Sequence, residues 1–206
     1  MTIRRGEPWG VPCELAADVT VVDGDAALSG VLTAARLGGA EPPLLAVRHG
    51  DVARTMGGAT TDRVVPGAVL VRAPIDAIRV TADGRAPAWC CAHVVARQRW
   101  WRGRVVIVAN AQFVDGRDVA PRAHPNDGRV DLLDVAPTMS WRDRVRAWRR
   151  TATGTHVPHP DIETRQVTSL VLEFDAPVGV WLDGRRWQRA QRLEVEVEAD
   201  AVTVLA

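Results

Sequence analysis

Residues 104–135 read RVVIVANAQFVDGRDVAPRAHPNDGRVDLLDV and contain the stretch that decides the fold. Two runs with several branched apolar residues, 104–110 and 128–135, lie on either side of a polar loop from Asp115 to Asp127. Each run is rich in branched apolar residues and is far shorter than the roughly 20 residues that a membrane-spanning helix needs. Both runs therefore predict buried strands.

The sequence around this stretch continues the same pattern. From about Pro66 the hydrophobic period is two, which is typical of antiparallel strands, with turns expected at Asp83-Gly84 and Arg102-Gly103. One helix is expected at 141–151, with Ser140 as its N-cap. Further strands are predicted at 69–71, 77–81, 89–95, 167–174, 179–182, 193–197 and 201–205.

The N-terminal part has a different order of elements. A strand at 19–22 and a helix at 26–36 are followed by a strand at 44–47 and a short helix at 52–56, and this alternation indicates a parallel sheet covered by helices. We therefore expect an α/β + β fold. A small parallel α/β domain, truncated and nucleotide-binding-like, would span residues 1–66, and an antiparallel β-sandwich-like domain with one intervening helix would span residues 67–206.

Composition excludes several classes of function. The 206 residues carry 26 basic and 25 acidic side chains, a net charge of +1, so no nucleic-acid partner is expected. Every basic residue is arginine, which excludes Schiff-base chemistry and a Walker-type lysine. Three cysteines without a CxxC pair indicate buried thiols in a reducing compartment. No secretory signal is seen, so we expect a cytoplasmic protein, with peripheral attachment to a membrane as a further expectation.

Five short motifs, in this order and spacing, point to one family. Residues 22–25 (VDGD) take the place of a GGDGT turn, and residues 51–57 (DVARTMG) are similar to NDxARxLG. Residues 110–132 follow the pattern N…GGG…xPxAxxxDGxLDL, residues 154–156 follow GxH, and residues 180–184 (VWLDG) follow xxLDGE. Together they resemble the diacylglycerol-kinase-like lipid kinases, which include sphingosine and ceramide kinases.

The resemblance implies ATP-dependent phosphoryl transfer to a lipid hydroxyl, in a cleft between an α/β domain and a β-sandwich-like domain. It implies a magnesium site in which the Asp127 side chain and the main-chain carbonyls of His124 and Arg129 are ligands; a plain hairpin turn is the alternative for Asn126-Asp127-Gly128. The residues that the resemblance assigns to the ATP cofactor are Gly24, Asp25, Arg48, Gly50 and Asp51.

Departures from the family pattern argue against catalysis. The GGDGT turn reads Asp23-Gly24-Asp25-Ala26-Ala27 here, and the second glycine loop, GTGND, reads VRHGD at residues 47–51. Arg185 replaces the glutamate that acts as base, and a guanidinium cannot accept a proton, so Asp183 would be the substitute base. We also expect the family's opening strand–helix unit and its NPxxG turn to be missing.

We therefore expect a catalytically impaired protein that binds a lipid, a membrane surface or a protein partner. The alternatives are an active lipid kinase dependent on Mg²⁺ and ATP, and a structural module that pairs with another chain, for example as a homodimer. The spacing His156-x-x-His159-x-Asp161 is compatible with zinc. The tryptophans and arginines of residues 99–102 and 141–150 suit a bilayer interface, or else a buried tryptophan face with solvated arginines opposite.

Overall fold

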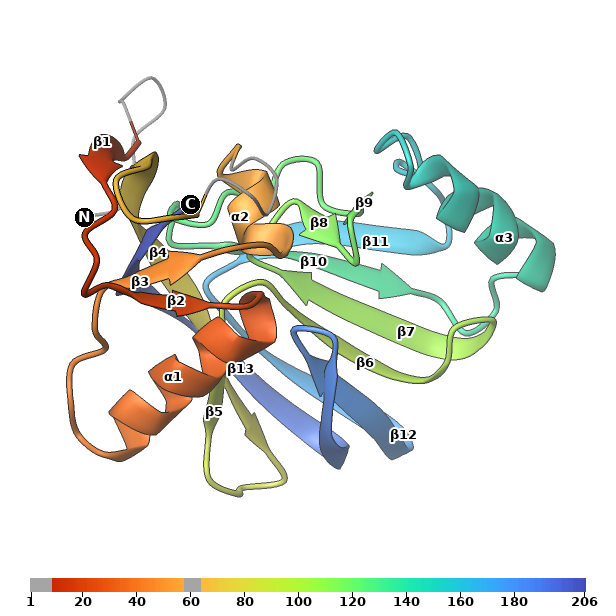
Figure 1. Ribbon diagram of the computed structural model, residues 1–206. Coiled ribbons are helices and arrows are strands. Elements are labelled where there is room, and N and C mark those ends of the chain that lie inside the picture. Colours follow the sequence, from red (N-terminus) through yellow and green to blue (C-terminus); the bar gives the residue numbers. More distant parts are fainter. Residues whose placement is uncertain (1–8, 58–63) are drawn as a thin grey trace.

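The computed structural model describes residues 9–57 and 64–206, and within them one mostly antiparallel sheet of eleven strands dominates (Figure 1). Its main path runs β1-β4-β13-β12-β6-β7-β10-β11. The helices are α1 (Asp25–Leu37), α2 (Asp51–Thr55) and α3 (Trp141–Arg150). The strands are β1 (Val11–Glu14), β2 (Thr20–Val22), β3 (Leu45–Val47), β4 (Val69–Ala82), β5 (Ala88–Cys90), β6 (His93–Arg99), β7 (Arg102–Ala109), β8 (Phe113–Val114), β9 (Arg117–Asp118), β10 (Val130–Val135), β11 (Ile162–Val167), β12 (Ser169–Leu182) and β13 (Arg185–Leu205).

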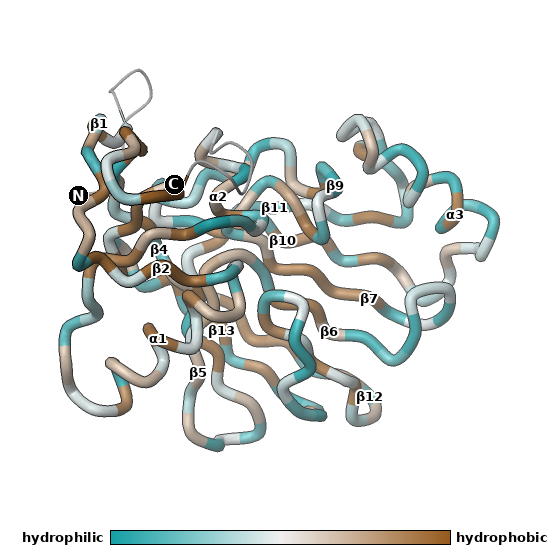
Figure 2. Tube along the Cα trace, viewed as in Figure 1, coloured by the Kyte–Doolittle hydropathy of each residue, from teal (hydrophilic) through white to brown (hydrophobic). Residues whose placement is uncertain are grey.

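The apolar run in β7 is continuous because both faces of this strand are buried. Val106 and Val108 face a core that also contains residues of β4, β12 and β13, so strands from both halves of the sheet share one interior, as in a sandwich. Val105 and Ile107 face a second cluster that lies beneath α3. Figure 2 shows this as apolar colour along β6 and β7. The predicted antiparallel, β-rich architecture with few helices is confirmed.

The N-terminal strands are part of the same sheet. β2 and β3 pair in parallel and are joined by α1, whose Leu28 and Leu32 are fully buried. β3 also pairs in parallel with the end of β13, where Val204 lies opposite Leu45. A separate parallel α/β domain is therefore not observed. The boundary expected between residues 66 and 67 stays a prediction, and residues 1–8 and 58–63 of the predicted first domain lie outside the described residues.

Several predicted strand bounds are wrong for identifiable reasons. The strands expected at 69–71 and 77–81 are one strand, β4, and those expected at 193–197 and 201–205 are parts of β13, joined across a bulge between Glu198 and Val202. The strand expected at 89–95 is broken after Cys90, because the next three backbone N–H groups turn toward the Asp183 carboxylate. The turn expected at 102–103 lies at residues 100–101 instead.

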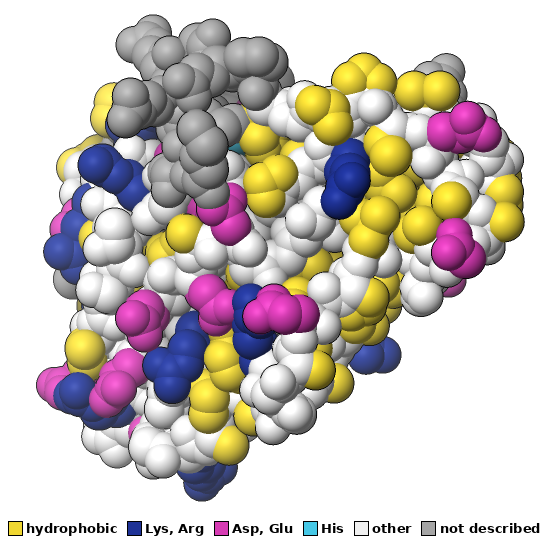
Figure 3. Space-filling view, turned by 90° about the vertical axis from the view of Figure 1, so that its left-hand side faces the viewer, with side chains coloured by type: hydrophobic (Ala, Val, Ile, Leu, Met, Phe, Trp, Pro, Cys, Tyr) yellow, Lys and Arg dark blue, Asp and Glu magenta, His cyan; other side chains and the backbone are white. Residues whose placement is uncertain are grey.

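On the face shown in Figure 3, basic and acidic side chains are interspersed, so this face has no large region of a single sign. Within the described part of the chain, every helix is too short or too polar to cross a bilayer.

Candidate functional site

A polar cavity of about 440 Å³ lies where the turns after β2 and β3 meet the β8–β9 hairpin and the start of β6. It brings together most of the residues predicted to hold a nucleotide, and it also contains Asp183. Arg48 is not among its lining residues: its guanidinium pairs with Asp23 at 2.7 Å, and both side chains are exposed. The lining residues are Asp23, Gly24, Asp25, Ala26, His49, Gly50, Asp51, Arg54, His93, Asp115, Gly116 and Asp183.

Asp25 joins the two N-terminal turns. It is the first residue of α1, and its carboxylate accepts the backbone N–H groups of Asp51 at 2.5 Å and Val52 at 3.1 Å, at the start of α2. Gly50 lies directly against this carboxylate, so an added Cβ would collide with it, and its φ of +122° also favours glycine. Burial, and to a smaller degree the charge of Asp183, raise the pKa of Asp25 to about 7, although the two backbone N–H groups that it accepts lower it.

Asp51 and Asp183 are both tied to backbone groups. Asp51 accepts the N–H groups of Asp115 at 2.8 Å and Gly116 at 2.9 Å, which attaches the β8–β9 turn to α2. Asp183 accepts the N–H groups of residues 91, 92 and 93 at 3.1, 3.0 and 2.8 Å, and the hydroxyl of Ser29 also donates to it. Four donors occupy the carboxylate of the predicted substitute base, so the geometry gives Asp183 a role in holding these segments together. Arg185 is exposed at the start of β13.

The charges of this cavity do not fit the phosphates of ATP. Five of its lining residues are aspartates, at positions 23, 25, 51, 115 and 183, whereas Arg54 is the single arginine among them. Even with the raised pKa of Asp25, the other four aspartates leave an excess of negative charge in the same space. Polyphosphate binding relies on backbone N–H groups and cations, so this cavity attracts cations rather than a triphosphate.

The predicted magnesium residues lie outside this cavity, beside the fully buried Asp76 of β4. Asp76 accepts the N–H groups of Gly128 at 2.7 Å and Asp200 at 2.9 Å. Burial, together with a smaller effect of the Asp127 charge, raises the pKa of Asp76 to about 6, although the N–H of Gly128 lowers it. Burial also raises the pKa of Asp127.

The oxygen atoms around Asp76 are of the kinds that bind a hard cation such as Mg²⁺. Asn126 Oδ1 is buried and, within the described residues, accepts no hydrogen bond. The His124 ring packs edge-on against Trp9 and its Nδ1 accepts the Asn126 N–H, so this nitrogen is already occupied. Carboxylate, amide and carbonyl oxygens are the ligands that Mg²⁺ prefers, and the ion would neutralise the paired charges of Asp76 and Asp127. The magnesium site stays a prediction, and Asp76 is a residue that the sequence analysis missed.

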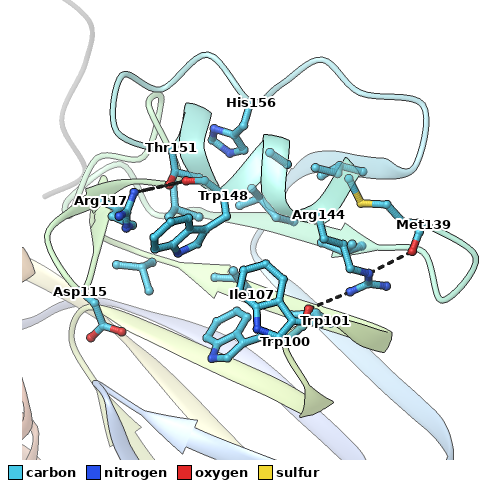
Figure 4. A pocket seen from close by; sticks show the side chains of 17 residues that line it. Trp100, Trp101, Ile107, Asp115, Arg117, Met139, Arg144, Trp148, Thr151 and His156 are labelled. Atoms are coloured by element: carbon cyan, nitrogen blue, oxygen red, sulfur yellow. Dashed lines mark hydrogen bonds between the residues drawn. The ribbon is translucent and has the colours of Figure 1, made fainter. Parts of the chain in front are cut away.

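An apolar cavity of about 390 Å³ lies between α3 and the outer face of the sheet (Figure 4). Arg144 of α3 is buried at its back and donates to four main-chain carbonyls, those of Met139 at 3.1 Å, Trp100 at 3.1 Å, Gly103 at 2.5 Å and Ala136 at 2.8 Å. The cavity is lined by Trp100, Trp101, Val105, Ile107, Val114, Asp115, Arg117, Val119, Leu133, Val135, Met139, Arg144, Ala147, Trp148, Thr151, His156 and Ile162.

Tryptophans at the edge of this cavity are exposed. Trp101 is 47% exposed, and Trp141 and Trp148 of α3 are 62% and 48% exposed, so the expectation of a buried tryptophan face on this helix is wrong. The Arg117 guanidinium lies 3.8 Å from the centre of the Trp148 ring. The zinc hypothesis is also wrong. His156 lines the apolar cavity, and in the described part of the chain its nitrogens do not lie close enough to ligand atoms of both His159 and Asp161 to share an ion with them.

Comparison with known proteins agrees with this architecture. Three solved structures from Bacillus anthracis str. Sterne are similar, each over 91% of this chain. Two are candidate diacylglycerol kinases, with TM-scores of 0.69 and 0.66 at 14% identity over 77% and 78% of their chains. The third is a diacylglycerol kinase, with a TM-score of 0.62 at 15% identity over 76% of its chain. At these identities the likeness shows the fold.

No curated protein matches the chain. A family model matches residues 69–206, more than half of the sequence, and its description is the YegS C-terminal NAD kinase beta sandwich-like domain. The chain therefore belongs to the YegS C-terminal, NAD kinase beta sandwich-like family, and it has the fold of the diacylglycerol-kinase-like proteins.

Proposed function

We propose that this protein is a catalytically impaired relative of the lipid kinases that binds a single-chain acyl lipid. The apolar cavity beneath α3 carries the proposal. Its volume of about 390 Å³ is within the range of small-molecule sites, roughly 300–1,000 Å³, and most of its lining side chains are apolar. An acyl chain is the apolar part of the substrates that the resemblance implies.

The edge of the cavity suits a lipid headgroup and a bilayer surface. Trp100 and Trp101 are exposed at the β6–β7 turn, next to Trp148 and Arg117. Tryptophan rings favour the boundary between hydrocarbon and water, and arginine pairs with anionic headgroups. The lipid would enter between these rings, and the protein would rest on the membrane surface through them.

The loss of catalysis is proposed from the polar cavity. Arg185 cannot act as a base, four donors occupy the Asp183 carboxylate, and the lining aspartates repel a triphosphate. The protein would then bind a lipid in the apolar cavity without transferring phosphate to it. The bound cation expected at Asp127 would have a structural role, holding the 124–129 turn against Asp76.

A cavity-filling variant tests lipid binding. Ala147 lines the cavity, and tryptophan at this position would occupy the space of the acyl chain. Ala152 is exposed just beyond the same helix and provides the matched control, Ala152→Trp. With a fluorescent long-chain fatty acid as probe, we expect saturable binding to the wild type and the control, and at least tenfold weaker binding to Ala147→Trp. Equal affinities for the two variants, or no saturable binding to the wild type, would refute the proposal.

The impairment is tested separately by incubating the protein with Mg-ATP and either diacylglycerol or a sphingoid base. We expect no phosphorylated lipid. Product formation that disappears in Asp127→Ala would show an active enzyme and overturn this part of the proposal.

A further inference from the structure

Three side chains from distant parts of the chain converge in the polar cavity, each on a different element. Asp51 is at the start of α2, His93 at the start of β6, and Asp115 in the turn between β8 and β9. One potential ligand atom from each lies within 4.8 Å of the other two, and His93 Nδ1 is 3.7 Å from Asp51 Oδ2. Asp51 and His93 are buried, whereas Asp115 is exposed to the cavity mouth.

His93 is the observation that points to a ligand. Its side chain is only 3% exposed, and its Nδ1 atom is buried with no hydrogen-bond partner in the part of the chain that the structure describes. The 3.7 Å separation from Asp51 is too long for a hydrogen bond. A buried nitrogen left unpaired is costly, at about 1–3 kcal/mol. A cation between His93 and the two carboxylates would satisfy all three groups.

The ligands are held in place by their surroundings. The two carboxylate oxygens of Asp51 each accept a backbone N–H, from Asp115 and Gly116, which fixes the carboxylate and the turn that carries Asp115. The backbone N–H of His93 donates to Asp183 at 2.8 Å, which fixes the start of β6. Asp115 has a φ of +50°, a conformation in which aspartate and asparagine are enriched, so the turn does not depend on the charge of the side chain.

The spacing and the atom types favour a transition metal over magnesium. Bond lengths of about 2.0–2.2 Å to nitrogen and oxygen place the ligand atoms of a tetrahedral zinc ion about 3.4 Å apart, so the 3.7 Å between His93 and Asp51 needs a change of only a few tenths of an ångström. Imidazole nitrogen together with carboxylate oxygen suits zinc and its neighbours, whereas magnesium prefers oxygen ligands alone. The further carboxylate of Asp183 in the same cavity also favours a cation here.

We propose that Asp51, His93 and Asp115 bind a divalent transition-metal ion of the zinc type, with a remaining coordination position open to the polar cavity. A zinc ion held by three protein ligands keeps a fourth position for water or another small ligand. This site is separate from the oxygen-rich cluster around Asp76 and Asp127, and it does not depend on lipid binding.

Calorimetric titration of the chelator-treated full chain with ZnCl₂ tests the proposal, with MgCl₂ as the comparison ion and the visible absorption of bound Co²⁺ as a second readout. The first variant, Asp115→Asn, changes an exposed residue whose backbone conformation asparagine tolerates. The second, His93→Phe, removes the nitrogen ligand. The control is His49→Asn, because His49 is an exposed histidine in the same cavity but outside the cluster.

We expect one zinc ion per chain in the wild type and in His49→Asn, with the Co²⁺ spectrum of a four-coordinate site. Asp115→Asn should bind zinc at least tenfold more weakly, and magnesium should not compete for the ion. Failure of the wild type to bind zinc with a defined stoichiometry would overturn the proposal. Unchanged zinc affinity in Asp115→Asn would do the same, even if His93→Phe fails to fold.

Discussion

Arg144 is the residue whose replacement should most clearly test the structure around α3. Its side chain is 4% exposed and donates to the carbonyls of Met139, Trp100, Gly103 and Ala136. A hydrogen bond that involves a charged group contributes about 1.5–3 kcal/mol, so four of them set an upper limit close to the total stability of a small protein, about 5–15 kcal/mol. Replacing Arg144 should lower the free energy of unfolding by less than this limit, because water can reach some of the carbonyls that lose their partner and no unpaired charge stays buried.

We expect Arg144→Met, which keeps the length of the side chain, to lower the free energy of unfolding by about 3–5 kcal/mol. Arg144→Lys keeps a charge, but its three N–H donors are on a single nitrogen that cannot reach all four carbonyls, so about half of this loss is expected. The control is Arg149→Met, an exposed position on the same helix, with an expected change below about 0.5 kcal/mol. Urea unfolding followed by tryptophan fluorescence measures all three variants. If Arg144→Met lowered the free energy of unfolding no more than the control does, the idea that this side chain holds α3 against the 100–103 and 136–139 segments would be refuted.

Three further predictions concern other parts of the molecule. Gly50→Ala should lower stability by about 2–4 kcal/mol in thermal unfolding, because the new Cβ meets the Asp25 carboxylate, whereas Gly84→Ala, in open space, should cost about 1 kcal/mol. Burial lowers the pKa of His156, although the nearby Val119 backbone opposes this, so the unfolded chain takes up the His156 proton more readily than the folded chain. Stability should therefore fall as the pH drops below about 6.5, and urea unfolding at pH 7 and pH 5 should show a smaller fall in His156→Phe. Millimolar Mg-ATP should leave the midpoint of thermal unfolding unchanged. An ATP site filled at 100 times its Kd would instead raise the free energy of unfolding by about 2.7 kcal/mol. A rise in the midpoint that Asp25→Ala removes would contradict the prediction.

The antiparallel strands were predictable because their side chains face defined environments. The run 105–109 is apolar at every position since this part of β7 is buried on both faces, and this pattern is visible in the sequence alone. The turns at Gly24 and Gly50 were also predictable, because the motifs place glycine where φ is positive. The joining of β3 to β13 was not, since no local pattern encodes which distant strand lies next to another.

The site could be predicted only in part. Motifs identified Asp25, Asp51 and Asp183, but not that backbone donors occupy Asp183, since its partners are 90 to 154 residues away. Arg144 resembled the other arginines of its helix, and its burial follows from carbonyls on other segments. One signal was available for Asp76: it lies between Ile75 and Ala77, directly before the strand predicted at 77–81, and an aspartate that joins a buried strand indicates a partnered carboxylate.

The pairing of β3 with β13 has a consequence for folding during synthesis. Residues 45–47 leave the ribosome early, but their parallel partner, residues 204–205, is made about 160 residues later. At a synthesis rate of about 5–20 residues per second, β3 therefore spends roughly 8–30 seconds with the backbone groups of one edge unpaired. The N-terminal helix and its strands should therefore be open to chaperones and proteases during this interval. Ribosome-bound chains that stop before residue 200 should show protease cleavage near residues 40–57, and this cleavage should disappear once residue 206 has left the exit tunnel.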